Sequence, residues 1–187
     1  MRIKIKYAKV ELPAVVIPPV VKTPTTTTTV QKKKPATGKK VIVIDPGDEF
    51  DKINKVINNR EVLAILITHK HSDHIGALKY FENINIYSYD NLKEQEYNID
   101  KFKFNVIFNP GHSSDSVSYY FKEYNYLFCG DFIFYHNIGR CDLPTGNFNE
   151  MLESISKIKT LPDNTIIYPG HDKTTTIKEE KQHNYYF

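Results

Sequence analysis

The 187-residue chain contains no tryptophan and only two cysteines, Cys129 and Cys141, which do not form a CxxC pair. So few cysteines exclude a disulfide-rich scaffold and favour reduced thiols in a cytoplasmic protein. Long apolar runs are also lacking, because the stretch at 14–21 is short and contains two prolines. It cannot span a bilayer, and the alternating charged and apolar residues of 1–10 do not form a secretory signal. We therefore expect no membrane partner.

Acidic residues are nearly absent from the first part of the chain. Residues 1–40 carry ten Lys or Arg and one acidic residue, whereas the remainder carries 15 basic and 21 acidic residues. The lysines lie among Thr and Pro without the interleaved aromatic residues of a single-strand binder, so we expect no nucleic-acid partner. The Thr and Lys runs within 22–40 predict a flexible loop, because they offer little apolar surface to bury.

The rest of the composition, 40% hydrophobic and 25% charged residues, is typical of one globular domain. Alternating or continuous apolar runs predict strands, and apolar stripes with helical spacing predict helices. The predicted strands lie at 1–10, 14–21, 41–44, 62–67, 84–87, 103–108, 116–121, 126–129 and 165–168, and the predicted helices at 48–58, 73–81, 147–158 and 179–184. This interleaving predicts sheet layers with helices outside them.

The residues most indicative of chemistry follow the predicted buried strand at 62–67. Three histidines and one aspartate, His69, His71, Asp73 and His74, fall within six residues. The end of a strand releases the chain into a loop where several side chains can converge on one point. Imidazole nitrogen suits zinc and iron, and a carboxylate neutralises part of the metal charge. The segment therefore predicts a metal site.

Three more predicted strands end in a turn that carries a residue of metal-ligand type. The turns are Pro110-Gly111-His112, Gly130-Asp131 and Pro169-Gly170-His171. Glycine before the ligand permits a sharp turn and a close approach of the backbone, and proline restricts the entry angle. Each turn alone is unremarkable, but together they place five of the seven histidines at strand ends.

The order HxHxDH, PGH, GD and PGH resembles the metallo-β-lactamase superfamily from about residue 41 to 187. The stretches at 130–134 and 138–144, and the PGH at 169–171 followed by 175–177, are similar to the short glyoxalase II-like branch, which includes hydroxyacylglutathione hydrolase. The resemblance implies an α+β fold, a four-layer αββα sandwich of two mixed β-sheets with helices on both outer faces. It also implies that residues 1–187 form a single domain.

The resemblance further implies a dinuclear centre with two Zn²⁺ ions, for which iron or manganese are the alternatives. The first metal would be held by His69, His71 and His112, the second by Asp73, His74 and His171, and Asp131 would bridge both. Asp73 and Asp131 would also act in catalysis. A metal-bridging hydroxide would attack the acyl carbon of a small thioester such as an S-2-hydroxyacylglutathione, because zinc lowers the pKa of bound water to about 7.

Four residues near these motifs are candidate substrate contacts: Lys70, Tyr135, His136 and Arg140. Three of them also have a simpler interpretation, since Lys70 could face solvent, His136 could be an ordinary loop residue, and Arg140 could brace its loop through Asp142. Other activities stay open as well. They are hydrolysis of a lactone or β-lactam, di-iron redox chemistry, and metal binding with little turnover. The sequence does not indicate an oligomeric state.

Overall fold

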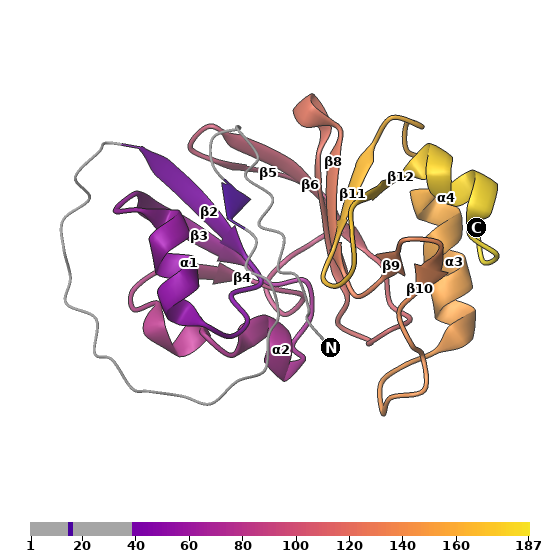
Figure 1. Cartoon of the computed structure of the whole chain (residues 1–187), viewed down its shortest axis with the longest axis horizontal. Coiled ribbons are helices and arrows are strands. Elements are labelled where there is room, and N and C mark those ends of the chain that lie inside the picture. The colour runs from indigo at the N-terminus through magenta and orange to yellow at the C-terminus, as the bar shows by residue number, and fades with distance from the viewer. Residues whose placement is uncertain (1–14, 17–38) are drawn as a thin grey trace. The chain divides into compact units, whose positions relative to one another are not determined.

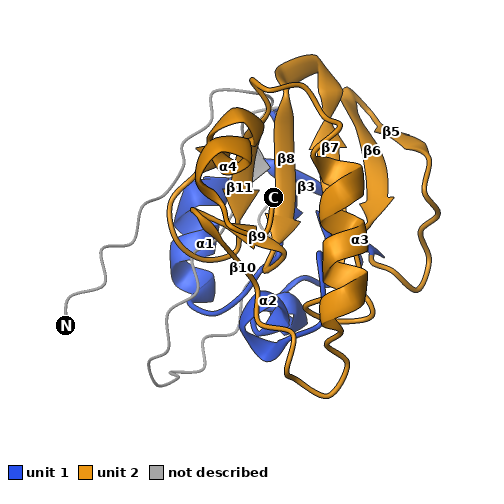
Figure 2. Cartoon of the chain, turned by 90° about the vertical axis from the view of Figure 1, so that its right-hand side faces the viewer, with its two compact units in different colours: residues 1–87 blue, residues 88–187 orange. Residues whose placement is uncertain are grey.

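The computed structural model describes residues 15–16 and 39–187 (Figure 1). The predicted strand at 1–10, most of the predicted strand at 14–21 and almost all of the predicted loop at 22–40 lie outside the described residues. The chain divides into two compact units, unit 1 at Met1–Tyr87 and unit 2 at Ser88–Phe187 (Figure 2). Each unit contains its own β-sheet.

Unit 1 is built on a parallel sheet with the strand order β1-β2-β3-β4. The strands are β1 (Val15–Val16), β2 (Lys40–Ile44), β3 (Glu61–Leu66) and β4 (Asn85–Tyr87), and helix α1 (Phe50–Ile57) connects β2 to β3. These positions confirm the strands predicted at 41–44, 62–67 and 84–87 and the helix predicted within 48–58. The β2-α1-β3 connection brings the ends of β2 and β3 to the same edge of the sheet.

The core of unit 1 explains the continuous apolar runs of its strands. Ile53 and Ile57 of α1 pack against a sheet face formed by Val41, Val43 and Ile65. The intervening residues Ile42, Ile44 and Leu66, which point to the opposite face, are also buried. Because both faces of β2 and β3 are buried, these strands contain few polar residues.

The helix predicted at 73–81 is wrong as a continuous element. A short helix α2 (Ser72–Ile75) is followed by a separate 3-10 turn at Leu78–Tyr80. The break occurs because the backbone N–H of Ala77 donates to the carbonyl of Pro46, at 2.9 Å, and not to a carbonyl of α2. Tertiary contact with the turn after β2 therefore overrides local helix propensity.

Unit 2 contains a mixed six-stranded sheet with the order β12-β11-β8-β7-β6-β5. Strand β11 runs parallel to β8, and the other neighbours are antiparallel. The strands are β5 (Glu96–Ile99), β6 (Phe102–Phe108), β7 (Val117–Phe121), β8 (Tyr126–Gly130), β11 (Ile166–Pro169) and β12 (Thr175–Thr176), with a separate hairpin of β9 (Ile133–Phe134) and β10 (Asn137–Ile138). The strands β5, β9, β10 and β12 were not predicted.

Helices α3 (Phe148–Ile158) and α4 (Ile177–His183) pack against one face of this sheet. Met151, Ile155 and Ile158 of α3 contact a buried cluster that includes Leu127 and Ile167. The side chain of Asn147 caps α3 by accepting the backbone N–H groups of residues 149 and 150. This capping contact explains why α3 begins directly after Asn147.

The opposite face of the unit 2 sheet carries buried aromatic side chains. Phe104 contacts Tyr119 and Phe121, and Phe121 contacts Phe128 edge to face. Each unit thus combines a β-sheet with packed helices, which agrees with the predicted α+β class. No helix in the described residues is long and apolar enough to cross a membrane.

Candidate metal centre

Side chains of metal-ligand type gather at strand ends in both units. Unit 1 contributes four such residues and unit 2 contributes three. They are the seven ligands predicted from the sequence: His69, His71, Asp73 and His74 in unit 1, and His112, Asp131 and His171 in unit 2.

The unit 1 residues lie in the connection from β3 to α2. The ring centroids of His69 and His71 are 4.6 Å apart, and those of His69 and His74 are 4.0 Å apart. His69 and His74 are buried, whereas His71 and Asp73 are half-buried. A short helix starting directly after His71 turns His74 back beside His69, so a six-residue segment presents several donors together.

Asp45, at the end of β2, organises this segment. Its two carboxylate oxygens accept the backbone N–H of Thr68 at 2.7 Å and the Thr68 hydroxyl at 2.6 Å. The second oxygen also lies 2.9 Å from Nδ1 of His74. Asp45 is buried and has a left-handed backbone conformation, with a φ of 46°. The carboxylate therefore connects the end of β2 to both the strand and the helix that carry the histidines.

These contacts determine which ring nitrogens carry protons. A carboxylate accepts hydrogen bonds, so Nδ1 of His74 donates to Asp45, and in the neutral imidazole Nε2 then keeps its lone pair. The Thr68 hydroxyl donates its single proton to Asp45, so it can only accept from Nδ1 of His69, which lies 3.1 Å away. Nε2 of His69 therefore also retains its lone pair. In the neutral form of each ring, these contacts favour the tautomer that a metal ligand requires.

In unit 2 the same logic applies to His112, which follows β6. Its Nδ1 lies 2.8 Å from the backbone carbonyl of Arg140 and must donate to it, because a carbonyl only accepts. In the neutral ring Nε2 is then the unprotonated nitrogen, and it lies 3.7 Å from Oδ2 of Asp131. Gly111 permits the turn before His112, since it has a φ of 149° and a Cβ there would meet the backbone of Met151 at 2.5 Å.

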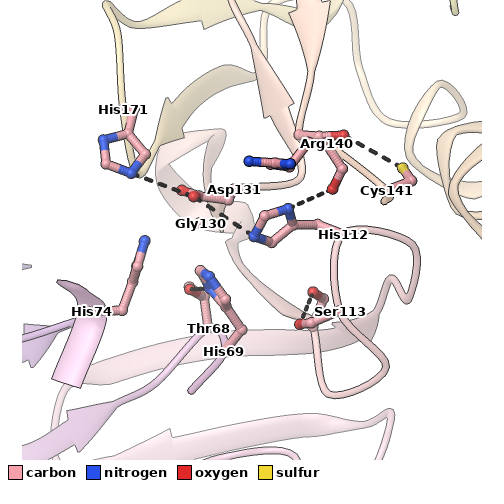
Figure 3. A network of polar contacts seen from close by, with 12 residues as sticks. Thr68, His69, His74, His112, Ser113, Gly130, Asp131, Arg140, Cys141 and His171 are labelled. Atoms are coloured by element: carbon pink, nitrogen blue, oxygen red, sulfur yellow. Dashed lines mark hydrogen bonds and ion pairs between the residues drawn. The ribbon is translucent and has the colours of Figure 1, made fainter. Parts of the chain in front are cut away.

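Asp131 lies between the two histidines of unit 2, as the dashed contacts in Figure 3 show. Its Oδ2 is 3.3 Å from Nε2 of His171, which follows β11. Asp131 itself follows β8, and Gly130 turns the chain with a φ of 54°. Since β8 and β11 are parallel neighbours, their carboxyl ends bring Asp131 and His171 to one edge of the sheet.

The donor sets of both units suit a transition metal. Histidine and aspartate are the ligands of many zinc and non-haem iron sites. For three histidines, His69, His74 and His112, an outward Nδ1 contact leaves Nε2 as a donor atom. Such contacts from a carboxylate or a backbone carbonyl are typical of metal-binding histidines.

The four predicted substrate contacts lie in different surroundings. Lys70 is exposed beside the ligand segment of unit 1. The Arg140 guanidinium makes two 2.7 Å bonds to Asp142, and these bonds raise the pKa of Arg140 and lower the pKa of Asp142 to about 2. Burial and the nearby Asp142 raise the pKa of the Cys141 thiol, so this thiol stays protonated at neutral pH.

Tyr135 and His136 lie in the turn of the β9–β10 hairpin and contact α4. Their rings stack at 3.8 Å, and Nε2 of His136 lies 2.7 Å from Glu179. The hydrogen bond from His136 lowers the pKa of Glu179. The ammonium of Lys173, two residues after His171, lies 3.3 Å from the centroid of the Tyr135 ring. A cation from the segment that follows His171 thus lies against the hairpin turn.

Sequence reasoning missed several residues that support the ligands. Asp45 follows a predicted strand, like the four ligand segments, and this shared position is a signal that was available in the sequence. Glu180 is fully buried and accepts from the backbone N–H of His136, from Thr175 and from Asn184. The contact from the backbone carbonyl of Arg140 could not be predicted from the sequence, because every residue has a backbone carbonyl.

Comparison with known families gives a match over most of the chain. The model described as "Metallo-beta-lactamase superfamily" matches residues 23–89 and 89–171. A probable metallo-hydrolase, YqgX of Bacillus subtilis, is 35% identical over 76% of this chain and 85% of its own length. A hydroxyacylglutathione hydrolase of Buchnera aphidicola is 34% identical over 71% of this chain, but this match spans only 58% of that protein.

Solved structures with the same fold include two that bear on the chemistry. The BLEG-1 B3 metallo-beta-lactamase superposes with a TM-score of 0.73 and 33% identity, covering 80% of this chain and 90% of that one. TTHA1623 in a di-iron-bound form has a TM-score of 0.70 and 29% identity, covering 77% of this chain and 88% of that one.

Proposed function

Because the chain belongs to the metallo-β-lactamase superfamily, we propose that it is a dinuclear metal-dependent hydrolase that cleaves a small thioester. The observation that carries the proposal is the position of Asp131, because one of its carboxylate oxygens, Oδ2, lies near both His112 and His171. A carboxylate between two histidine donors is suited to bridge two cations and to reduce their repulsion.

We propose the assignment of metal ligands that the superfamily implies. His69, His71 and His112 would hold the first metal, and Asp73, His74 and His171 the second, with Asp131 shared. The four-layer αββα sandwich of the superfamily is the architecture that we propose for this chain. Two Zn²⁺ ions suit this donor set, and the di-iron form of TTHA1623 makes iron the main alternative.

The bound ions would supply an acidified water and an electrophile for the acyl oxygen. The residues of the chain would provide the rest of the chemistry. Asp45 and the Arg140 carbonyl keep His74 and His112 in the tautomers that bind metal. Asp73 and Asp131 would balance charge, and Asp73 would also orient the attacking water. The thiolate released from a thioester needs no protonation to depart at neutral pH, so the site requires no separate general acid.

We propose that the substrate contacts are Lys70, Tyr135, His136 and Arg140. We add Lys173 to this set because its ammonium lies against the Tyr135 ring. The two lysines among them, Lys70 and Lys173, would suit a substrate with carboxylate groups, as in an acylglutathione. The site would thus act on a small molecule. Neither Cys129 nor Cys141 forms a disulfide among the described residues, which fits the cytoplasmic location that we propose.

The thioester assignment rests on the similarity to hydroxyacylglutathione hydrolases and to probable metallo-hydrolases. A second candidate activity is β-lactam hydrolysis, because the matched structure of BLEG-1 is titled a B3 metallo-beta-lactamase. Both reactions use the same attack on an acyl carbon. Only the leaving group and the contacts beyond the metals differ between them.

The deciding experiment is hydrolysis of S-D-lactoylglutathione and of a chromogenic cephalosporin by protein loaded with two equivalents of Zn²⁺. The variant His71→Ala, assayed in parallel, is the control for metal dependence. We expect thioester turnover that is lost in the variant, and little cephalosporin turnover. The opposite ratio of activities would favour the lactamase candidate. Failure to act on either substrate, with both metals bound, would contradict both assignments.

A further inference from the structure

Two buried polar side chains beside the His112 loop have no partner in the described part of the chain. Asn109 immediately precedes Pro110-Gly111-His112, and its side chain is fully buried, with neither the amide nitrogen nor the amide oxygen hydrogen-bonded. Ser118, in β7, is also fully buried, and its hydroxyl lacks a partner as well. Leaving such groups unsatisfied costs roughly 1–3 kcal/mol each, so native proteins rarely do so.

The sheet register places these two side chains on the same face. Ser118 pairs directly with Ile107 in the antiparallel β6–β7 ladder, and Asn109 lies two residues beyond Ile107. Because side chains alternate along a strand, Asn109, Ile107 and Ser118 all point to one side of the sheet. Ile107 packs against the cluster formed with α3, so this side is the one that α3 covers.

The distance between Asn109 and Ser118 indicates which group could form their missing hydrogen bonds. Diagonal neighbours across an antiparallel pair lie roughly 7–8 Å apart, too far for short side chains to bond directly. One water molecule that bonds to both side chains spans such a gap. The Asn109 amide offers two donors and one acceptor, and the Ser118 hydroxyl offers one donor and acceptor sites, which matches the two to four partners of a buried water.

The surroundings are polar enough for a water site and are tied to the ligand loop. Ser154 of α3, itself buried, donates to the carbonyl of Pro110 at 2.8 Å. The next carbonyl, that of Gly111, accepts the backbone N–H of Asn147 at 2.8 Å. The loop that carries His112 is thus attached to α3 on its helix side. The Asn109 side chain lies at the base of the same loop.

We propose that Asn109 and Ser118 bind a buried water molecule between the β6–β7 end and α3, and that Asn109 is thereby a positioning residue for His112. The water completes the hydrogen bonding at the base of the loop. This site does not depend on which substrate the proposed hydrolase acts on.

A high-resolution crystal structure of the unaltered protein tests the site directly. We expect density for one ordered water within hydrogen-bonding distance of both Asn109 and Ser118. Density for no water between the two side chains would overturn the proposal. This result does not require any variant to fold.

Stability and metal affinity test the positioning role. Asn109→Leu has nearly the same volume, so it should lower Tm if the amide binds water and should raise Tm if the amide is truly unsatisfied. Ser118→Ala should also lower Tm, and the double variant should lose clearly less than the sum of both, because the two side chains share one water. Ser156→Ala, which removes an exposed hydroxyl of α3, is the control and should leave Tm unchanged.

Zn²⁺ affinity, measured by competition with a chromophoric chelator, should fall roughly 10-fold in Asn109→Leu, as for other groups that orient a metal ligand. Asn109→Thr keeps a hydrogen-bonding group and should recover most of that affinity. Unchanged Zn²⁺ affinity in a folded Asn109→Leu variant would contradict the positioning role. A gain in Tm, or additive losses in the double variant, would contradict the shared water. Neither readout depends on turnover of any substrate.

Discussion

Oδ2 of Asp45 lies 2.9 Å from Nδ1 of His74, although the two residues are 29 positions apart in the chain. The same oxygen accepts the Thr68 hydroxyl, so one carboxylate sets the tautomers of both His74 and His69. The parallel pairing of β2 with β3 makes this contact, because it brings the carboxyl ends of both strands together.

Replacing Asp45 by asparagine should therefore weaken metal binding. Asparagine keeps the shape of the side chain but has one accepting oxygen in place of two, and it no longer stabilises the Nδ1 proton of His74. We expect a loss of Zn²⁺ affinity of roughly 10- to 100-fold, measured by chelator competition. Asp51→Asn, at an exposed position of α1, is the matched control. Equal affinities in the two variants would refute the orienting role of Asp45.

Gly139 should not tolerate even a methyl group. A Cβ at this position would lie 1.7 Å from the backbone oxygen of Asp131 and 3.1 Å from Nδ1 of His112. Gly139→Ala must therefore displace the backbone beside two predicted ligands, and we expect a lower Tm together with weaker Zn²⁺ binding. Asn137→Ala, in the same hairpin but exposed, should change neither quantity appreciably. Wild-type behaviour of Gly139→Ala would show that the hairpin is not closely packed there.

Glu179 and Glu180 are adjacent but should respond very differently to the same substitution. Glu180 is fully buried and accepts from the backbone of His136, from Thr175 and from Asn184. Glu180→Gln loses one accepting oxygen and the charge, so we expect Tm to fall by about 5–10 °C in a thermal melt. Glu179→Gln, at the surface, should change Tm by no more than about 2 °C. Similar melts for both variants would argue against the buried network.

The Arg140–Asp142 pair should make stability depend on pH only under acidic conditions. The hydrogen bond from Arg140 is the main cause that lowers the pKa of Asp142 from 3.8 to about 2 in the folded protein. A depressed pKa means that the pair stabilises the fold above about pH 4 and that this contribution is lost as the pH falls toward 2. An NMR titration of the Asp142 carboxyl carbon should give a midpoint near 2, and in Arg140→Gln the midpoint should move back up toward 3.8.

Lys173 should affect substrate binding more than turnover. Its ammonium lies over the Tyr135 ring, and it has no carboxylate partner in the described part of the chain. Under the proposed function, Lys173→Gln should raise KM for S-D-lactoylglutathione several-fold and leave kcat nearly unchanged. Lys178→Gln, an exposed residue of α4, is the control. A fall in kcat without a change in KM would assign Lys173 a different role.

Much of the secondary structure follows from local patterns. The long strands at 41–44, 62–67 and 103–108 have strong apolar patterns, and each is present in the structure. Two-residue strands such as β9, β10 and β12 have no period of their own, because they form only where a neighbouring strand offers hydrogen bonds. The helix predicted at 73–81 failed for a similar reason, since a contact from Ala77 to Pro46 interrupts it.

The sequence by itself determined the family, the strand-end positions of the seven predicted ligands, and the chemistry that such donors favour. These features are local: a motif of a few residues, or a turn directly after a strand. Only the tertiary structure decided the contacts that orient the ligands, from Asp45 to His74 and from the Arg140 carbonyl to His112. It also decided the burial of Glu180 and Asn109. Such contacts join residues that are far apart in the chain, and they depend on strand register, which no short stretch of sequence encodes.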